Sequence, residues 1–285
     1  MSLVIGEISY TNILPFFYYL DRESLISRGC GFVPKVPSDL NNGIVHGNIQ
    51  VGGISSFSYG EHSDDLVIFP NFSVSSPKEV GSIFLFSKVP ITQLHKKSIA
   101  LTTSSATSIN LLRIILKEYF HFDVNYEMMK PNYSKMMAEH DACLLIGDDA
   151  ITTSWSKEST IHQYDLGALW EYYTGYPMTY AVFAIRKDAC EMEPVLLEYL
   201  YYEFKKSKEK SIENNFQEMI QSIMQQFGGK KNFWNQYFSG LNYDLTARHI
   251  KGLKEYFHLA YKMELLPKKV EKIEIWQPTR HCHSV

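Results

Sequence analysis

The chain has 285 residues, of which 45% are hydrophobic and 21% are charged, a composition typical of a globular protein with a sizeable core. The formal net charge of -3 argues against nucleic-acid and membrane-surface roles, because both usually need a basic face. No export signal and no run of about 18 apolar residues is recognisable, and the cysteines are scattered without disulfide or metal spacing. These features predict a cytoplasmic protein that does not span a membrane.

Short apolar runs alternate with helical patterns along the first third of the chain. The expected strands are Leu3–Ile8, Phe32–Val36, Ile49–Ile54, Leu66–Phe69 and Ser82–Phe86, with helices at 13–20 and 38–46. This alternation is typical of βαβ units in a mainly parallel sheet.

The middle third has the pattern of a separate unit. Strands are expected at 98–103 and 142–146, with a helix at 108–120 between them and a returning strand at 180–185. The last hundred residues are mostly helical, at about 192–207, 212–226 and 244–265.

The pattern as a whole predicts two α/β lobes, with the chain crossing between them at roughly residues 88 and 184. One lobe would comprise residues 1–88 and 185–285, and the other residues 89–184. This is the organisation of the two-lobed solute-binding fold, the periplasmic-binding-protein-like (type II) class. A ligand is expected between the lobes, at the carboxyl ends of strands and at helix N-termini.

Five polar clusters fall where such a cleft would lie. They are Ser9-Tyr10-Thr11-Asn12, Gly52-Gly53-Ile54-Ser55-Ser56, Gly81-Ser82, Thr102 to Ser108, and Ile146-Gly147-Asp148-Asp149-Ala150.

The cluster before the helix at 108–120 has the clearest physical interpretation. The first N–H groups of a helix lack intrahelical partners and carry partial positive charge, and Thr107 and Ser108 add hydroxyl donors beside them. A carboxylate or phosphate can bind there without Lys or Arg. Simple N-capping by Ser105 or Thr107 is the alternative.

Other motifs leave alternatives open. Asp148, beside Gly147, either faces the cleft as a general acid or base, or caps the next helix together with Asp149. Thr174-Gly175-Tyr176-Pro177 forms either a loop that closes over the ligand or a structural turn, with Trp170 in the core. His281-Cys282-His283 lacks a third spaced ligand, and the other histidines are unpaired, so no metal site is expected.

The order of these motifs resembles the chorismate dehydratase family of the futalosine route to menaquinone. The resemblance runs over about residues 3 to 190, and Thr11 stands where a larger apolar residue is usual. It rests on Ile8 to Asn12, Ile54-Ser55, Gly81-Ser82, Ser105 with Thr107 and Ser108, Leu144 to Asp148, Asp165 to Gly167, Trp170, Thr174-Gly175 and Pro177.

The resemblance implies a hydro-lyase that converts chorismate to 3-(1-carboxyvinyloxy)benzoate and water. It implies no cofactor, because aromatisation of the ring supplies the driving force. Asn12 and Ser82 would contact the reacting ring and the leaving hydroxyl, and Asp148 or a carboxylate of the substrate would be the base. The implied substrate-binding residues are Ser9, Tyr10, Ser55, Ser56, Ser105, Thr107, Ser108, Gly147, Thr174 and Gly175.

Two other functions stay open at this point. A sister enzyme that acts on cyclic dehypoxanthine futalosine shares the fold, as does a non-catalytic cytoplasmic ligand sensor. The expected partner is a small-molecule substrate, chorismate, with no nucleic acid and no membrane, and a homodimer is open as the assembly.

Overall fold

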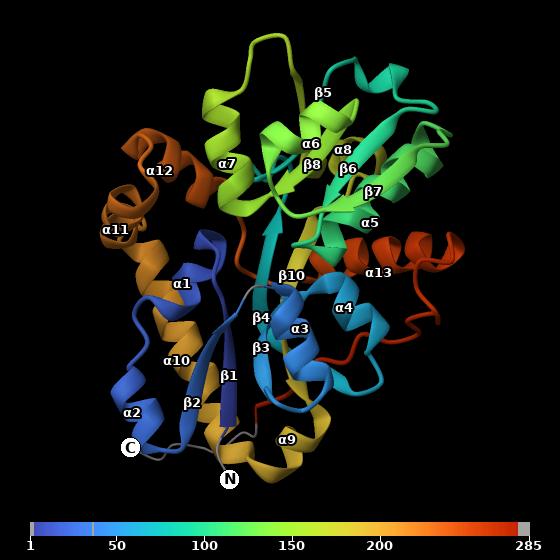
Figure 1. The fold of residues 1–285 in the computed structure, drawn as a ribbon. Coiled ribbons are helices and arrows are strands. Elements are labelled where there is room, and N and C mark those ends of the chain that lie inside the picture. The colour runs from blue at the N-terminus through green and yellow to red at the C-terminus, as the bar shows by residue number, and fades with distance from the viewer. Residues whose placement is uncertain (1–2, 36, 279–285) are drawn as a thin grey trace.

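The computed structural model describes residues 3–35 and 37–278, which form two five-stranded sheets joined by two crossing segments (Figure 1). The His281-Cys282-His283 motif lies outside the described residues. The first sheet has the order β2 (Cys30–Lys35), β1 (Leu3–Ile8), β3 (Val51–Ser55), β10 (Met178–Arg186) and β4 (Leu66–Ser76). The second has the order β7 (Asn125–Met129), β6 (Ser98–Thr102), β8 (Ala142–Ile146), β5 (Ile83–Ser87) and β9 (His162–Asp165).

One strand in each sheet runs against its neighbours. β1 pairs in parallel with β2 and β3, and β6 pairs in parallel with β7 and β8. In contrast, β10 is antiparallel to β3 and β4, and β5 is antiparallel to β8 and β9. Both reversed strands follow a crossing, so they start at the edge of the sheet where the other strands end.

The crossings lie earlier than the sequence pattern suggested. β5 ends before residue 88, yet it pairs with β8 of the second sheet. β10 begins before residue 184, yet it pairs with β3 of the first sheet. The expected boundaries are therefore wrong by several residues, because an apolar strand after a crossing has the same local pattern as one before it.

Helices complete the two lobes. The first sheet carries α1 (Leu14–Phe17), α2 (Arg22–Ser27), α3 (Pro37–Val45), α4 (Ser56–Glu61), α9 (Lys187–Met192), α10 (Pro194–Glu213), α11 (Gln217–Phe227), α12 (Lys231–Gly240) and α13 (Ala247–Lys262). The second sheet carries α5 (Ala106–Ile114), α6 (Tyr133–Glu139), α7 (Gly147–Ser156) and α8 (Leu166–Thr174). None of the helices in the described ranges is long and apolar enough to cross a membrane.

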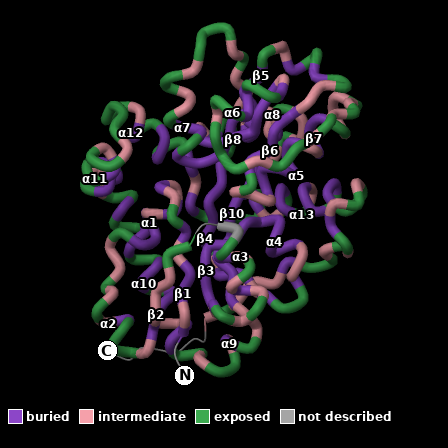
Figure 2. Tube along the Cα trace, viewed as in Figure 1, coloured by how far each residue is buried: buried purple, intermediate pink, exposed green. Residues whose placement is uncertain are grey.

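The core lies along both sheets, where the central strands are mostly buried, whereas much of α11 and α12 is exposed (Figure 2). An aromatic cluster joins α1 to the first sheet, with the rings of Phe16 and Phe183 4.3 Å apart. Phe72 and Phe204 extend this cluster through edge-to-face contacts, the arrangement that aromatic rings favour. The aromatic run after Asn12 is therefore a core anchor that fixes the end of β1.

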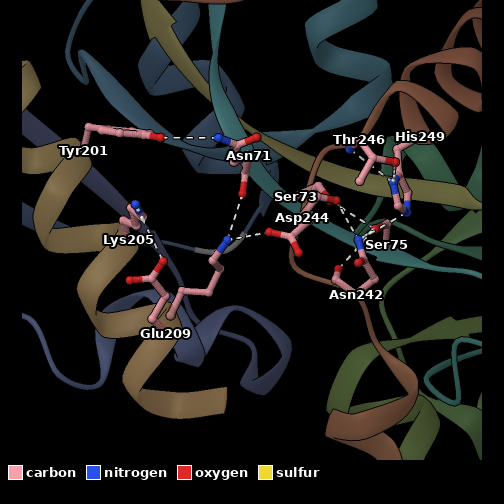
Figure 3. A network of polar contacts seen from close by, with 11 residues as sticks. Asn71, Ser73, Ser75, Tyr201, Lys205, Glu209, Asn242, Asp244, Thr246 and His249 are labelled. Atoms are coloured by element: carbon pink, nitrogen blue, oxygen red, sulfur yellow. Dashed lines mark hydrogen bonds and ion pairs between the residues drawn. The ribbon is translucent and has the colours of Figure 1, made fainter. Parts of the chain in front are cut away.

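A polar network ties the segment after α12 to β4 (Figure 3). Asn242 donates a hydrogen bond to Ser75 at 2.8 Å, and Ser73 donates to the carbonyl of Asp244 at 2.8 Å. The buried ammonium of Lys208 on α10 donates to the Asp244 carboxylate at 2.6 Å. These bonds fix the C-terminal end of α12 against the first sheet.

Candidate functional site

A narrow cleft, partly open to solvent and with a cavity volume of about 50 Å³, lies where the strands of both sheets meet. Strand direction explains the position of the cleft, because the parallel strands end at this edge and the reversed strands begin there. Its lining comprises Ile8, Tyr10, Asn12, Ser55, Val74, Ser82, Ile83, Ser105, Ser108, Ile146, Gly147, Tyr180 and Ala181.

Several residues expected from the sequence lie in this lining, namely Tyr10, Asn12, Ser55, Ser82, Ser105, Ser108 and Gly147. The remaining lining residues are five apolar side chains and Tyr180, whose hydroxyl is 3.1 Å from that of Ser76. Ile8, Ile83 and Ile146 are each next to an expected residue at the end or start of a strand, so the sequence could have indicated them as well. Tyr180 and Val74 carry no such signal.

Other residues that were expected in the cleft form hydrogen bonds within the protein instead. Ser9 is exposed, and its hydroxyl donates to the carbonyl of Lys35 at 3.3 Å. Ser56 is buried and donates to the carbonyl of Thr179 at 2.8 Å. The Thr107 hydroxyl accepts a hydrogen bond from the backbone N–H of Phe57 at 3.0 Å, so it joins α5 to the start of α4.

The Thr174-Gly175 motif is a structural turn. The Thr174 hydroxyl donates to the carbonyl of Trp170 at 2.7 Å, and Gly175 ends α8 in the left-handed conformation, with φ of 69°. Trp170 is fully buried. Neither Thr174 nor Gly175 lines the cleft. The pattern is thus that of a helix C-cap, in which glycine adopts a backbone conformation that other residues avoid.

Three serine hydroxyls of the lining share one hydrogen-bonding arrangement. Ser55 accepts from the amide of Asn41 at 3.3 Å and from the Ser58 N–H at 3.1 Å. Ser82 accepts from Tyr237 at 3.1 Å, and Ser108 accepts from Ser105 at 3.1 Å.

None of these three hydroxyls has an acceptor for its own proton within residues 3–35 and 37–278. A hydroxyl carries one proton to donate, so all three are free to donate to a ligand in the cleft.

The start of α5 is capped by a side chain and also keeps N–H groups free for an anion. Ser105 is the N-cap, because its side chain accepts from the Ser108 N–H at 3.2 Å. Among the described residues, the N–H groups of Ala106 and Thr107 have no acceptor. They remain available to an anion, together with the Ser108 hydroxyl.

The Asp148 side chain takes neither of the two positions that the sequence left open. Its side chain neither lines the cleft nor caps α7. Instead, its buried carboxylate accepts a hydrogen bond from the Thr11 hydroxyl at 2.7 Å. Burial raises the pKa of Asp148, and the hydrogen bonds from Thr11 oppose that rise. The expected cleft-facing carboxylate is therefore a link between the end of β1 and the start of α7.

Gly147 lies against the ring of Tyr10, so the two lobes meet at this point of the cleft. Gly147 has φ of 58°, and a Cβ atom there would lie 3.0 Å from the Tyr10 ring. The Gly147 N–H donates to the carbonyl of Ser82 at 2.7 Å. Burial raises the pKa of Tyr10, so its phenol stays protonated near neutral pH.

The Asn12 side chain is partly buried in the cleft wall and makes no hydrogen bond to any other described residue. An amide offers both a donor pair and an acceptor, so Asn12 can bind either kind of polar group on a ligand. The residues that line the cleft include no Asp, Glu, His, Lys or Arg within the described chain. The lining is therefore uncharged, with both polar and apolar side chains.

Solved structures share this architecture at low sequence identity. A protein from Archaeoglobus fulgidus is 18% identical, with a TM-score of 0.73 over 93% of this chain and 98% of that one. The alkanesulfonate-binding protein SsuA of Xanthomonas axonopodis pv. citri, bound to MOPS, is 16% identical, with a TM-score of 0.71 over 96% and 98%. A Candida albicans gene product with the generic periplasmic-binding-protein fold is 10% identical, with a TM-score of 0.63 over 97% and 98%. These similarities establish a two-lobed periplasmic-binding-protein-like fold.

Comparison with known sequences identifies the family, which the fold alone does not. The chorismate dehydratase of Thermus thermophilus is 31% identical over 199 residues, which is 65% of this chain and 70% of that protein. A protein-family model described as menaquinone biosynthesis matches residues 3–262, nearly the whole chain. This protein therefore belongs to the menaquinone biosynthesis family.

Proposed function

We propose that this protein is a chorismate dehydratase that converts chorismate to 3-(1-carboxyvinyloxy)benzoate and water. The similarity to the Thermus thermophilus enzyme supports the reaction class. The observation that carries the proposal is the neutral cleft, in which the hydroxyls of Ser55, Ser82 and Ser108 are all free to donate. Such a lining suits a small dianion rich in oxygen acceptors.

Substrate binding follows from the placement of helix ends. Chorismate carries two carboxylates, and the free N–H groups at the start of α5 suit one of them. The start of α7 is less suited, because Asp148 and Asp149 already place negative charge in its first turn. We therefore assign one substrate carboxylate to Ala106, Thr107 and Ser108.

The reaction removes a ring hydrogen and the hydroxyl on the adjacent carbon. The C–H bond breaks, its electron pair forms the third ring double bond, and the C–O bond breaks with its pair on oxygen. The proton and hydroxide leave together as water, so no electrons are gained or lost. Asn12 and Ser82 would contact the reacting ring and the leaving hydroxyl, where fixed dipoles stabilise the developing charge.

A carboxylate of the substrate is the favoured base. The lining offers no side chain that takes up a proton near neutral pH, among the residues that the structure describes. Asp148 is the nearest alternative, but its carboxylate is engaged by Thr11 and lies outside the lining. Its place in the proposal is to position Thr11 and the start of α7.

Incubation of the purified protein with chorismate tests the proposal, with the aromatic product followed by ultraviolet absorbance and mass. We expect Asn12→Ala to reduce kcat by about 100-fold, the cost of one well-placed polar group. Asp148→Asn retains an oxygen that can accept from Thr11, so we expect most of the activity to remain.

The alternatives give different results. Loss of activity in Asp148→Asn, with its fold intact, would restore Asp148 as the base. Turnover of cyclic dehypoxanthine futalosine instead of chorismate would identify the sister reaction. Binding of chorismate without turnover would support a ligand sensor.

A further inference from the structure

Tyr237 of α12 lies directly behind Ser82, although 155 residues separate them in the sequence. Its phenol donates a hydrogen bond to the Ser82 hydroxyl at 3.1 Å. The Tyr237 ring also packs against Gly81, where a Cβ atom would lie only 3.3 Å from it. Gly81 has φ of 71°, a conformation suited to glycine, so the chain bends there to bring Ser82 over the phenol.

The direction of this bond determines what Ser82 can do. Because the Ser82 oxygen accepts from Tyr237, its own proton points elsewhere, and no acceptor for it exists in the part of the chain that the structure describes. Ser82 is 1% exposed, yet it lines the cleft, so its proton is free to point into the cleft. A hydroxyl that accepts a hydrogen bond is also a stronger donor.

Tyr237 is buried among aromatic side chains. Its ring makes edge contacts with Trp234 and Phe238 of the same helix, at 5.8 and 5.2 Å. Burial raises the pKa of Tyr237 far above its ordinary value, so the phenol remains a donor across the working pH range. Thr11 and Asp148 are polar neighbours of the phenol, and both affect its pKa.

We propose that Tyr237 is a positioning residue for the dehydration, which aims the Ser82 hydroxyl at the leaving oxygen of the substrate. This inference rests on the proposed function. As the C–O bond breaks, the Ser82 O–H group donates a hydrogen bond to the oxygen that gains negative charge. Ser82 and Tyr237 keep their protons, because the proton that completes the water molecule comes from the ring C–H by way of the base.

Tyr237→Phe tests this role, because it removes only the phenol oxygen and keeps the ring contacts with Gly81, Trp234 and Phe238. We expect kcat for chorismate to fall by about 10-fold to 100-fold, with KM changed less than about twofold. Ser82→Ala is expected to lower kcat by about 100-fold or more. The double variant is expected to be no slower than Ser82→Ala, since Tyr237 acts through Ser82.

Tyr243→Phe is the matched control. Tyr243 is buried shortly after α12, and its phenol oxygen has no partner among the described residues. The Tyr243→Phe variant is expected to keep the kcat of the wild type. Melting curves of all variants test whether a loss of activity comes from unfolding. If Tyr237→Phe melts early, the kcat of the double variant is compared with that of Ser82→Ala alone.

The outcomes separate the two proposals. A wild-type protein that leaves chorismate unchanged refutes the proposed function, and this inference with it. An active wild type whose Tyr237→Phe variant keeps its kcat refutes the inference alone. Additive losses in the double variant also refute it, because they would show that Tyr237 does not act through Ser82.

Discussion

Replacement of Gly147 by alanine tests the contact that joins the two lobes beside the cleft. The added Cβ atom would lie 3.0 Å from the Cδ1 and Cε1 atoms of Tyr10. Ordinary carbon contacts are about 3.5–4.0 Å, so the ring has to move by about 0.5 Å or more. Tyr10 lines the cleft, so this movement changes the space that a ligand occupies.

The backbone supplies a second cost. Gly147 has φ of 58°, and a residue with a side chain pays about 1–2 kcal/mol in this conformation. Gly175 separates the two effects, because it has φ of 69° and open space where its Cβ would lie. Gly175→Ala carries the backbone cost alone, whereas Gly147→Ala carries the backbone cost and displaces Tyr10.

Two measurements distinguish these variants. In urea unfolding, we expect Gly175→Ala to lose about 1–2 kcal/mol and Gly147→Ala to lose at least as much. In steady-state kinetics with chorismate, we expect Gly175→Ala to match the wild type and Gly147→Ala to raise KM several-fold. If both variants show the same KM, the contact with Tyr10 does not shape the cleft and the reasoning fails.

Two further predictions concern the same interface. Thr11→Val removes a hydrogen bond that opposes the raised pKa of Asp148, so that pKa rises further. We expect a loss of about 1.5–3 kcal/mol in urea unfolding at pH 7. The loss shrinks as the pH falls through the raised pKa of Asp148, above the ordinary value of 3.8, because the carboxyl group is then neutral in the folded wild type and in the folded variant; a loss that does not vary with pH would contradict this account. Trp155 of α7 packs edge-on against Phe233 of α12 at 5.1 Å and is 41% exposed, so we expect Trp155→Ala to cost about 1–2 kcal/mol. Tyr172→Ala, at a position that is 78% exposed, serves as the control and is expected to cost under about 0.5 kcal/mol.

The sequence was sufficient to predict the part of the cleft lining that depends on strand ends. Asn12 and Ser55 come at or after the ends of apolar runs that had to be strands, and the carboxyl ends of parallel strands meet at one edge. Ser82 instead precedes its strand, and it reaches the same edge because β5 runs against its neighbours. Ser105 and Ser108 follow from the same rule at the start of a helix. The two-lobed fold was predictable for the same reason, because alternating apolar runs and helical patterns are local features.

The remaining assignments depended on contacts that are not local. Side chains of neighbouring residues point in different directions at a strand end, so Ser55 lines the cleft whereas Ser56 binds a carbonyl inside the protein. Asp148 was expected in the cleft because nothing in the sequence pairs it with Thr11. Tyr237 was missed entirely, since α12 was not expected and a single tyrosine in a polar, aromatic-rich segment has no distinguishing pattern.

The position of β10 sets an order of events for the nascent chain. β10 lies between β3 and β4, and Ser55 pairs with Ala181, so the first sheet joins segments that are far apart in sequence. All strands of the second sheet lie between residues 83 and 165, so that lobe is synthesised in full before β10 leaves the ribosome. Until then, β3 and β4 expose unpaired edges on either side of an empty strand position. Pairings of such high contact order form slowly, which makes this interval the point at which the chain most needs protection from aggregation.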